Sequence, residues 1–396
     1  MSYRALLRRN HNIKILSCVQ FITYFGAWFS QAGVFTLLVD LSAPTWAISV
    51  SAMLAFLPGI FLAPINGVIV EKNKPKKLLI AMASVELVSI FSLIFVTSLE
   101  RLWLLFILIF LRLCVASIYF QAQMSLLAKI LNSKELKLAN EIHSIIWAVS
   151  YTSGMSLAGI FIYFLNVQTA FLFDCFLLGI GILFLLNLKI NDFKSEVTQQ
   201  IGAMIKEGFL YVFKNKTIFH LILLHAFLGL TAYEALVTLL AKHSYKELLS
   251  ASLVIGFLNA VRALALMVSP MILSPFINEK TTGYLYFGQG FGILFWALTQ
   301  FNFYLSFLGL LAAGFCTSSL WSYTYTMIQK NSDKKYYGRV IAYTDMIFLS
   351  FSAMISILVG VLFDWGLGLN LITALLGMAF IFAGLYWTWF YKNHLN

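Results

Sequence analysis

The chain has 396 residues, of which 61% are hydrophobic and only 11% are charged. A water-soluble protein carries roughly 25% charged residues, so this composition excludes a soluble globular fold and indicates lipid as the solvent. The formal net charge of +11 does not indicate nucleic-acid binding, because the basic residues lie in short loops between apolar segments. No cofactor or metal site is expected, since the four cysteines fall singly inside apolar segments.

A basic stretch at residues 1–14 precedes the first long apolar run. That run continues to about residue 39 and is too long for the core of a signal peptide, so we expect an uncleaved first membrane helix. A membrane-spanning helix takes about 20 mainly apolar residues. Segments of this kind lie near residues 15–38, 46–70, 78–98, 102–127, 139–165, 168–190, 216–240, 248–274, 283–300, 303–328, 338–362 and 366–391.

Basic loop residues predict how these spans are oriented. The loops predicted inside contain Lys72, Lys74, Lys76, Lys77, Lys129, Lys134, Lys137, Lys330, Lys334, Lys335 and Arg339. The loops predicted outside contain Arg101, Lys242 and Lys246. Short cytoplasmic loops carry an excess of Lys and Arg. We therefore predict a multi-pass protein of the inner membrane with both termini in the cytoplasm.

The longest polar segment, residues 191–214, divides the chain in two. Apolar residues recur in it at helical spacing, so we expect an interfacial helix. The predicted organisation is an N-terminal six-helix bundle at residues 1–190, a cytoplasmic linker with this helix at 191–214, and a C-terminal six-helix bundle at 215–396.

Short sequences repeat between the two predicted halves. The second helix ends in residues 67–72, Gly-Val-Ile-Val-Glu-Lys, much as the eighth ends in residues 275–280, Pro-Phe-Ile-Asn-Glu-Lys. Residues 132–134 before the fifth span likewise parallel residues 331–333 before the eleventh. Two related bundles of six helices are typical of a transporter, because a pseudosymmetric pair can rock around a central site.

Residues 67–77 read Gly-Val-Ile-Val-Glu-Lys-Asn-Lys-Pro-Lys-Lys. This segment resembles the signature loop of the major facilitator superfamily, with Glu71 for the usual Asp and Lys for each Arg. Further segments resemble the drug:proton antiporter branch that contains macrolide and siderophore exporters; they are residues 20–30, 38–42, 138–140, 170–174 and 337–340. The resemblance covers most of residues 10–362 and implies an all-α membrane fold of twelve helices in two pseudosymmetric six-helix bundles.

In the resembled fold, the first, fourth, seventh and tenth helices line a central cavity. The resemblance therefore implies a set of cavity residues on the first and tenth helices, namely Gln20, Tyr24, Trp28, Gln31, Trp321 and Tyr325. Aromatic rings beside amides and hydroxyls suit a bulky, partly apolar ligand. The alternative is ordinary packing, since aromatic residues are common throughout the chain.

Arg112 lies about ten residues into the fourth span, which places it near mid-membrane. An ionisable side chain there costs about 2.5–3.5 kcal/mol on insertion scales, so it calls for a reason. One reason is substrate binding in the cavity, because a guanidinium can clamp an anionic group. The alternative is a structural ion pair with Glu86 or with another buried acid.

The seventh span contains two titratable residues. We expect Glu234 to carry the coupling proton, because a buried carboxyl group can exchange a proton for substrate. The alternative for Glu234 is an inert acid facing the outer vestibule. His225, nine residues earlier, suits a proton relay or is simply a packed residue.

Other charged residues suggest gates. The resemblance places Glu71 near the start of the eleventh helix, where the helix dipole favours a carboxylate by about 0.3–1 kcal/mol. We expect Glu71, Lys72 and Arg339 to form a cytoplasmic gate; alternatively, these charges only set the topology. Arg262 and Asp345 could form a second gating pair or a static one.

These features predict a secondary active transporter that exports an amphipathic small molecule, such as a drug, an antibiotic or a siderophore-like metabolite, by proton antiport and alternating access. A lysophospholipid flippase or a solute importer of the same fold is the alternative. We expect no enzyme, because Glu141 and His143 form too small a cluster for a catalytic or metal site. The expected partners are the substrate, protons and membrane lipids, with the chain acting as a monomer.

Overall fold

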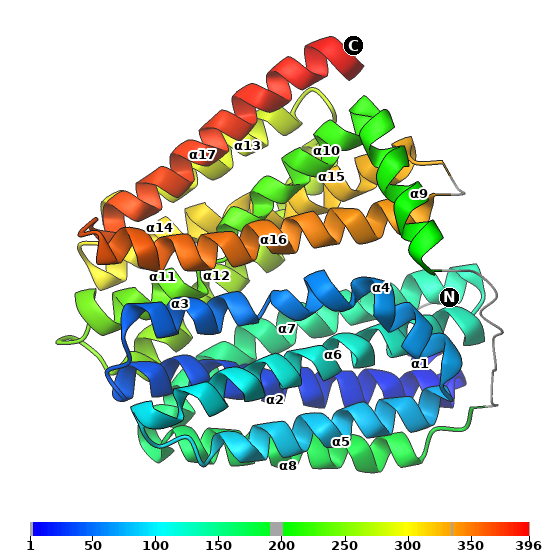
Figure 1. Cartoon of the computed structure of the whole chain (residues 1–396), viewed down its shortest axis with the longest axis horizontal. Coiled ribbons are helices and arrows are strands. Elements are labelled where there is room, and N and C mark those ends of the chain that lie inside the picture. Colours follow the sequence, from blue (N-terminus) through cyan, green and yellow to red (C-terminus); the bar gives the residue numbers. More distant parts are fainter. Residues whose placement is uncertain (1–2, 191–200, 334–335, 396) are drawn as a thin grey trace. The chain divides into compact units, whose positions relative to one another are not determined.

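The computed structural model describes residues 3–190, 201–333 and 336–395, and all regular structure in these residues is helical (Figure 1). The first part of the chain forms α1 (Tyr3–Arg9), α2 (His11–Asp40), α3 (Thr45–Leu54), α4 (Leu57–Lys72), α5 (Pro75–Leu93), η1 (Leu99–Arg101), α6 (Leu102–Ile130), α7 (Ser133–Leu165) and α8 (Val167–Leu186). The second part forms α9 (Ile201–Lys214), α10 (Lys216–Ala226), η2 (Phe227–Thr231), α11 (Glu234–Leu239), η3 (Leu240–Ser244), α12 (Ala251–Leu273), η4 (Ser274–Phe276), α13 (Thr282–Thr299), α14 (Phe303–Phe315), α15 (Thr317–Asn331), α16 (Tyr337–Asp364), α17 (Leu369–Phe390) and η5 (Tyr391–Leu395).

Each of the twelve predicted spans contains helix. In the described residues, 10 helical segments are long and apolar enough to cross a membrane. The two remaining spans contain α5 and α13. They are more polar, because α5 carries Lys76, Lys77 and Glu86 and α13 carries Gln289. The predicted all-α membrane fold with twelve spanning helices is confirmed. Helix α9 shows that Ile201–Lys214 is helical, and its role as a cytoplasmic linker stays a prediction.

Asparagine side chains fix where several helices begin. Asn10, Asn166, Asn215 and Asn302 each accept a hydrogen bond from a backbone N–H in the first turn of the helix that follows. Asn132 does the same and forms a reciprocal capping box with Glu135 at the start of α7. A helix leaves its first N–H groups without intrahelical partners, so these caps stabilise the starts of α2, α7, α8, α10 and α14.

The chain forms two compact units. Unit 1 comprises Met1–Ala43, Phe61–Thr198 and Ser250–Phe257, and unit 2 comprises Pro44–Ile60, Gln199–Leu249 and Leu258–Asn396. Within unit 1, α2 packs against α7 and α8, and α5 packs against α6 and α8. Within unit 2, α13 packs against α14 and α17, and α3 packs against α16. The predicted division of the chain at residues 191–214 stays a prediction.

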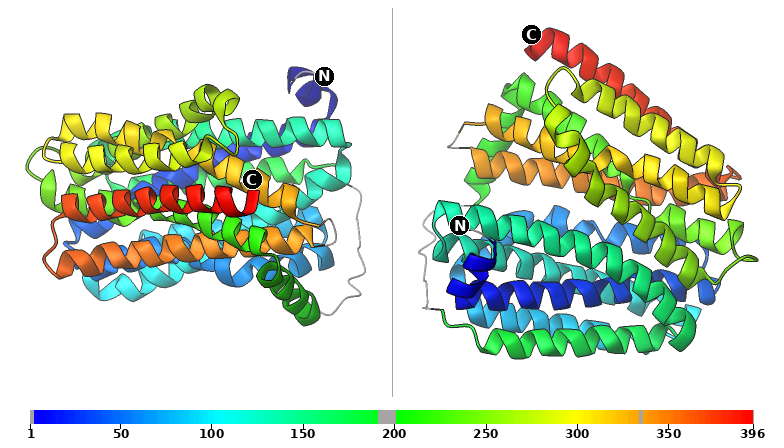
Figure 2. Two further views of the ribbon diagram at one scale, coloured as in Figure 1. Left: turned by 90° about the horizontal axis from the view of Figure 1, so that it is seen from above. Right: turned by 180° about the vertical axis from the view of Figure 1, so that it is seen from behind.

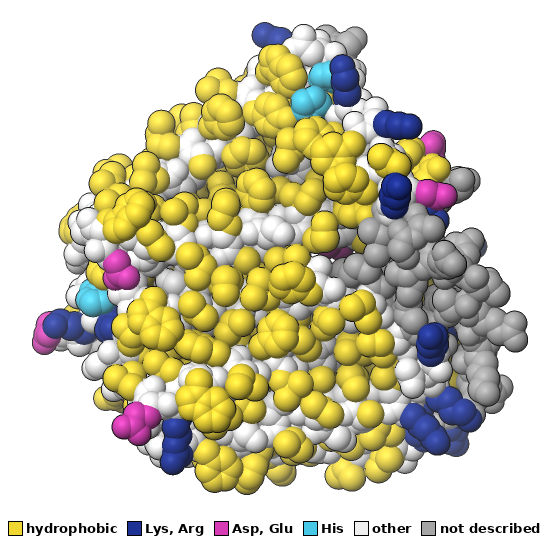
Figure 3. All heavy atoms as spheres, in the orientation of Figure 1, with side chains coloured by type: hydrophobic (Ala, Val, Ile, Leu, Met, Phe, Trp, Pro, Cys, Tyr) yellow, Lys and Arg dark blue, Asp and Glu magenta, His cyan; other side chains and the backbone are white. Residues whose placement is uncertain are grey.

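Large apolar side chains are exposed on the outside of both units. In unit 1, Val88, Trp103 and Leu183 are 61%, 62% and 63% exposed. In unit 2, Met271 and Leu298 are 79% and 74% exposed. Figure 3 shows apolar side chains over most of the viewed face and charged side chains near its edges. Exposed apolar surface of this extent requires lipid contact, as expected for a multi-pass membrane protein.

Helices α13 and α17 run side by side, as the views in Figure 2 show. Glycines permit their close approach. A Cβ atom on Gly377 would lie 3.0 Å from the carbonyl oxygen of Gly290, and one on Gly290 would lie 2.9 Å from that of Gly377. Small residues at a helix interface bring the two backbones together, which adds van der Waals contact where no hydrophobic effect acts.

We predict that Gly377→Leu lowers the thermal stability of the detergent-solubilised protein. The larger side chain has to displace Leu294 or separate α13 from α17, and overpacking of this kind costs about 1–3 kcal/mol. The matched control is Gly179→Leu, because a Cβ atom there meets nothing within 4 Å. Thermal unfolding followed by size-exclusion chromatography measures the effect; equal unfolding temperatures for both variants would contradict it.

Candidate functional site

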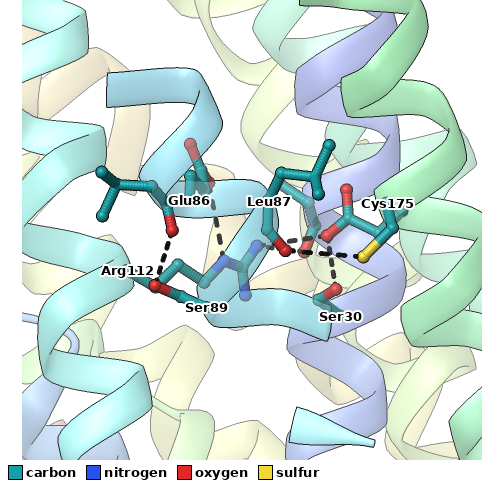
Figure 4. Close-up of polar contacts among 9 residues, drawn as sticks. Ser30, Glu86, Leu87, Ser89, Arg112 and Cys175 are labelled. Atoms are coloured by element: carbon teal, nitrogen blue, oxygen red, sulfur yellow. Dashed lines mark hydrogen bonds and ion pairs between the residues drawn. The ribbon is translucent and has the colours of Figure 1, made fainter. Parts of the chain in front are cut away.

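Arg112 lies at the centre of a buried charge network in unit 1 (Figure 4). Its Nε atom lies 3.6 Å from Oε1 of Glu86 on α5, and its Nη2 atom lies 3.6 Å from Oδ2 of Asp174 on α8. The same Nη2 donates a 3.2 Å hydrogen bond to the carbonyl of Ala27 on α2. Ser30, also on α2, donates to Asp174. The guanidinium therefore joins four helices of one unit.

This placement favours the ion-pair alternative for Arg112. The guanidinium lies close to two carboxylates and donates to one carbonyl group, and the side chain is only 8% exposed. Its Nε atom has no hydrogen-bond partner among the described residues. Ala27 on α2 contributes only its backbone carbonyl. The acidic partners come instead from α5 and α8. A role for Arg112 in contacting substrate stays a prediction.

The predicted cavity residues of α2 lie beside an aromatic cluster. Gln20 hydrogen-bonds to the ring of His143 on α7, and the Tyr24 ring lies 6.0 Å from the His143 ring, edge to face. Trp28 stacks on Tyr151 with the ring centres 4.2 Å apart. Gln31, farther along α2, is half-buried. Amide, imidazole and indole groups thus follow one another along α2 and α7.

In unit 2 the seventh span is interrupted. Helix α10 ends at Ala226, η2 continues in a tighter 3₁₀ winding to Thr231, and α11 begins at Glu234. Arg262 on α12 bridges this break. It donates a 2.6 Å hydrogen bond to the carbonyl of Thr231, and its Nη1 atom lies 3.3 Å from Oε1 of Glu234. The guanidinium also lies over the Tyr233 ring, 4.9 Å from its centre.

Glu234 keeps one oxygen unused. Its Oε2 atom is buried and has no hydrogen-bond partner among the described residues. A buried polar atom without a partner is costly, so such atoms often mark a functional group. Discontinuous membrane helices are also a common place for substrate and coupling-ion sites in transporters.

The tenth span is interrupted in a similar way. Helix α14 ends at Phe315 and α15 begins at Thr317. Gln289 on α13 bridges the two, donating a 2.6 Å hydrogen bond to the carbonyl of Ala313 and accepting one of 3.1 Å from Thr317. A Cβ atom on Gly314 would lie 3.4 Å from the carbonyl oxygen of Arg262. The residue that bridges the first break therefore lies close to the second.

His225 is fully buried among aromatic rings of unit 2. Its Nδ1 atom lies 2.8 Å from the Thr324 hydroxyl, and its Nε2 atom has no hydrogen-bond partner among the described residues. The rings of Trp321 and Tyr325 stack 4.8 Å apart, and their centres lie 5.6 and 5.5 Å from the imidazole. The structure thus brings three of the predicted site residues together.

Arg262 and Asp345 have partners different from those that the sequence suggested. Arg262 pairs with Glu234, whereas Asp345 accepts a 3.5 Å hydrogen bond from the Tyr325 hydroxyl. The sequence does not reveal how α12 is rotated about its axis, and this rotation decides which residues Arg262 faces. In the structure, Arg262 faces the break in the seventh span and donates a hydrogen bond to the carbonyl of Thr231.

Among the predicted gating residues, Arg339 has a defined partner. Its Nη1 atom donates a 2.8 Å hydrogen bond to Glu207 on α9, and Tyr211 on α9 stacks on Tyr336 with the ring centres 4.3 Å apart. These contacts fasten α9 to the start of α16. Lys72 is exposed, and the side chain of Glu71 lies outside the described part of the structure.

Comparison of the chain with known proteins identifies its family. Residues 16–357 match the model of the Major Facilitator Superfamily. The chain belongs to that superfamily. Its members are membrane transporters rather than enzymes. The chain is 25% identical over 215 residues to YfiS of Bacillus subtilis (strain 168), an uncharacterised transporter of the same type. That match spans 53% of this chain and about half of the relative's length, 51%.

Solved structures share the fold. The nucleoside transporter NupG is 15% identical, with a TM-score of 0.75 over 99% of this chain and 100% of NupG. A POT family transporter in complex with 5-aminolevulinic acid is 12% identical, with a TM-score of 0.75 over 96% of each chain. At these identities, the likeness to this Major Facilitator Superfamily chain is one of fold alone.

Sequence reasoning did not single out Gln289, Glu207 or Lys76 for their structural contacts. Gln289 bridges a helix break, and Glu207 pairs with Arg339. Lys76 donates hydrogen bonds of 2.7 and 3.0 Å to the carbonyls of Leu186 and Leu188 at the end of α8. One available signal was Gln289 itself, since a long polar side chain inside an apolar span calls for a partner.

We predict that Arg112→Met strongly destabilises the protein. The substitution leaves Glu86 and Asp174 buried without their cation, and breaking a buried pair in this way costs about 3–5 kcal/mol. Replacing all three by Met, Gln and Asn should restore most of the lost stability. Thermal unfolding in detergent is the measurement, with the exposed Arg101→Met as control. Equal stability of Arg112→Met and Arg101→Met would contradict the prediction.

Proposed function

We propose that this chain is a secondary active transporter that exports an amphipathic small molecule by proton antiport. One observation carries the proposal. The seventh span is broken next to a carboxyl group, Glu234, which is paired with Arg262. One buried oxygen of Glu234 has no hydrogen-bond partner in the described part of the chain. A proton on Glu234 removes the negative charge that holds the guanidinium. Proton binding would then change how α11 is attached to α12.

The coupling would work through competition. Glu234 takes a proton when the carrier is open to the outside and releases it when the carrier is open to the cytoplasm. Substrate moves in the opposite direction, because the deprotonated and protonated carriers favour different arrangements of the seventh span. His225 lies on the same span and serves as a relay in this scheme. Glu71, Lys72, Asp345 and Arg339 are its proposed gating residues.

The proposed cargo follows from the side chains near these groups. In unit 2, stacked Trp321 and Tyr325 present aromatic surface beside a buried imidazole. In unit 1, Gln20, Tyr24 and Trp28 present a similar mixture, with Gln31 and Arg112 as further proposed contacts. Aromatic rings that carry a polar group suit a ligand that is apolar in part and can stack.

The distribution of basic loop residues supports the proposed orientation. Both termini would lie in the cytoplasm and the chain would work in the inner membrane as a monomer. Import of a solute is the second candidate; the chain shares its fold with a nucleoside transporter and a POT family transporter. A lysophospholipid flippase is the third, and it would transport without a proton gradient.

We predict that Glu234→Gln abolishes transport driven by an imposed pH gradient in proteoliposomes, lowering the rate at least about tenfold. The amide cannot exchange a proton. Substrate-for-substrate exchange needs no net proton movement and should persist. The matched control is Glu247→Gln, whose carboxylate is 89% exposed and which should transport normally. Unchanged pH-driven transport in Glu234→Gln would overturn the coupling role.

We also predict that Trp321→Leu weakens the binding of an aromatic substrate about two- to tenfold, because a stacked aromatic pair contributes ~0.5–1.5 kcal/mol beyond its buried area. Trp103→Leu is the control, since that ring is 62% exposed on the outside of α6. Binding to the purified protein, measured by calorimetry, distinguishes the two. Equal losses in both variants would exclude Trp321 as a substrate contact.

A further inference from the structure

Unit 1 contains a pocket of about 450 Å³ that none of the proposed coupling residues lines. It lies between the end of α2, the turn from α7 to α8, and the first residues of α12. Its polar lining includes Thr36, Asp40, Thr97, Tyr163, Gln168 and Ser252. A volume of this order matches sites that hold small organic molecules.

Asp40 gives the pocket a negative charge. It is the last residue of α2, where the dipole of the helix disfavours an anion. The Asp40 side chain forms no ion pair and no hydrogen bond with any described residue. The residues that line the pocket include no Lys, Arg or His. A carboxylate so placed is ready to receive a cation from outside the protein.

Thr36 supplies a second polar group one helical turn before Asp40, on the same face of α2. The residue is 2% exposed, and its hydroxyl has no hydrogen-bond partner among the described residues. Several other buried threonines of this chain bond back to their own helix. Thr344 donates to the carbonyl of Val340, and Thr373 donates to that of Leu369. Thr36 is one of the residues that line the pocket.

Aromatic and apolar side chains complete the lining. Tyr163 and Phe164 line it with their rings 5.1 Å apart, and Leu37 and Ile162 add aliphatic surface. An aromatic face attracts a cation electrostatically, and aliphatic groups shelter the rest of a ligand from water. Asn166 stabilises the turn by accepting hydrogen bonds from the backbone N–H and the hydroxyl of Thr169.

We infer that this pocket binds an organic amine, with the ammonium group on Asp40 and Thr36 and its apolar part against Leu37 and Ile162. The inference does not depend on proton antiport or on the direction of transport. The ammonium group can belong to a free amine or to the headgroup of an aminophospholipid, since the recognition chemistry is the same.

The test uses the purified full chain in nanodiscs of phosphatidylcholine, with 2-phenylethylamine as the probe and neutral 2-phenylethanol as its uncharged counterpart. Calorimetry should detect the amine and not the alcohol. Asp40→Asn should weaken amine binding about tenfold, the loss of one charge-assisted contact. Thr36→Val keeps the shape of the side chain and should weaken it less. Glu100→Gln makes the same change of charge at an exposed residue outside the pocket and should have no effect.

Two results would overturn the inference: equal affinity for the amine in wild type and Asp40→Asn, or equal binding of the amine and the alcohol. Nanodiscs that contain phosphatidylethanolamine separate the two sources of the ammonium group. If this lipid lowers the affinity for the amine in wild type but not in Asp40→Asn, the headgroup occupies the site. If the affinity is unchanged, the site belongs to a free amine.

Discussion

Hydrocarbon offers no hydrogen-bond partner, so a charged side chain inside a membrane helix is stable only when the protein supplies its partners. Arg112 and Arg262 meet this requirement in their separate units. Arg112 is held by two carboxylates and a carbonyl within unit 1, and Arg262 is held by Glu234 and the carbonyl of Thr231 within unit 2. Each guanidinium thereby fixes the packing of the helices around it.

The two networks differ in how many partners surround their acidic side chains. In unit 1 the acids outnumber the guanidinium, and Ser30 also donates to Asp174. Such a network holds helices in place, as a buried group with several partners is hard to move. In unit 2, Glu234 pairs with Arg262, and its second oxygen has no hydrogen-bond partner within residues 3–190, 201–333 and 336–395. A group with an unfilled position can accept a proton or a ligand, and this difference separates the structural site from the proposed coupling site.

The sequence predicted the helices well because each span is a long apolar run, a signal that lipid imposes over about 20 residues. It also predicted helix in the linker, from the spacing of its apolar residues. The ion-pair partners of the buried charged side chains were harder to predict. Arg262 was expected beside Asp345 and lies against Glu234, because partner choice depends on the rotation of each helix about its axis. The breaks near Thr231 and Cys316 were missed as well, since no proline lies at either one and the bridging side chains come from other helices.

Those bridging side chains have a mechanical consequence. An ordinary helix can bend sharply only by giving up backbone hydrogen bonds, which is expensive in lipid. At the breaks in unit 2, Arg262 and Gln289 already satisfy the carbonyls of Thr231 and Ala313. Because flexible side chains can follow a moving carbonyl, bending there costs little backbone bonding. The stiffness of these two helix breaks therefore depends on the guanidinium of Arg262 and the amide of Gln289. Substitution of either residue would leave a buried carbonyl at a break without its partner.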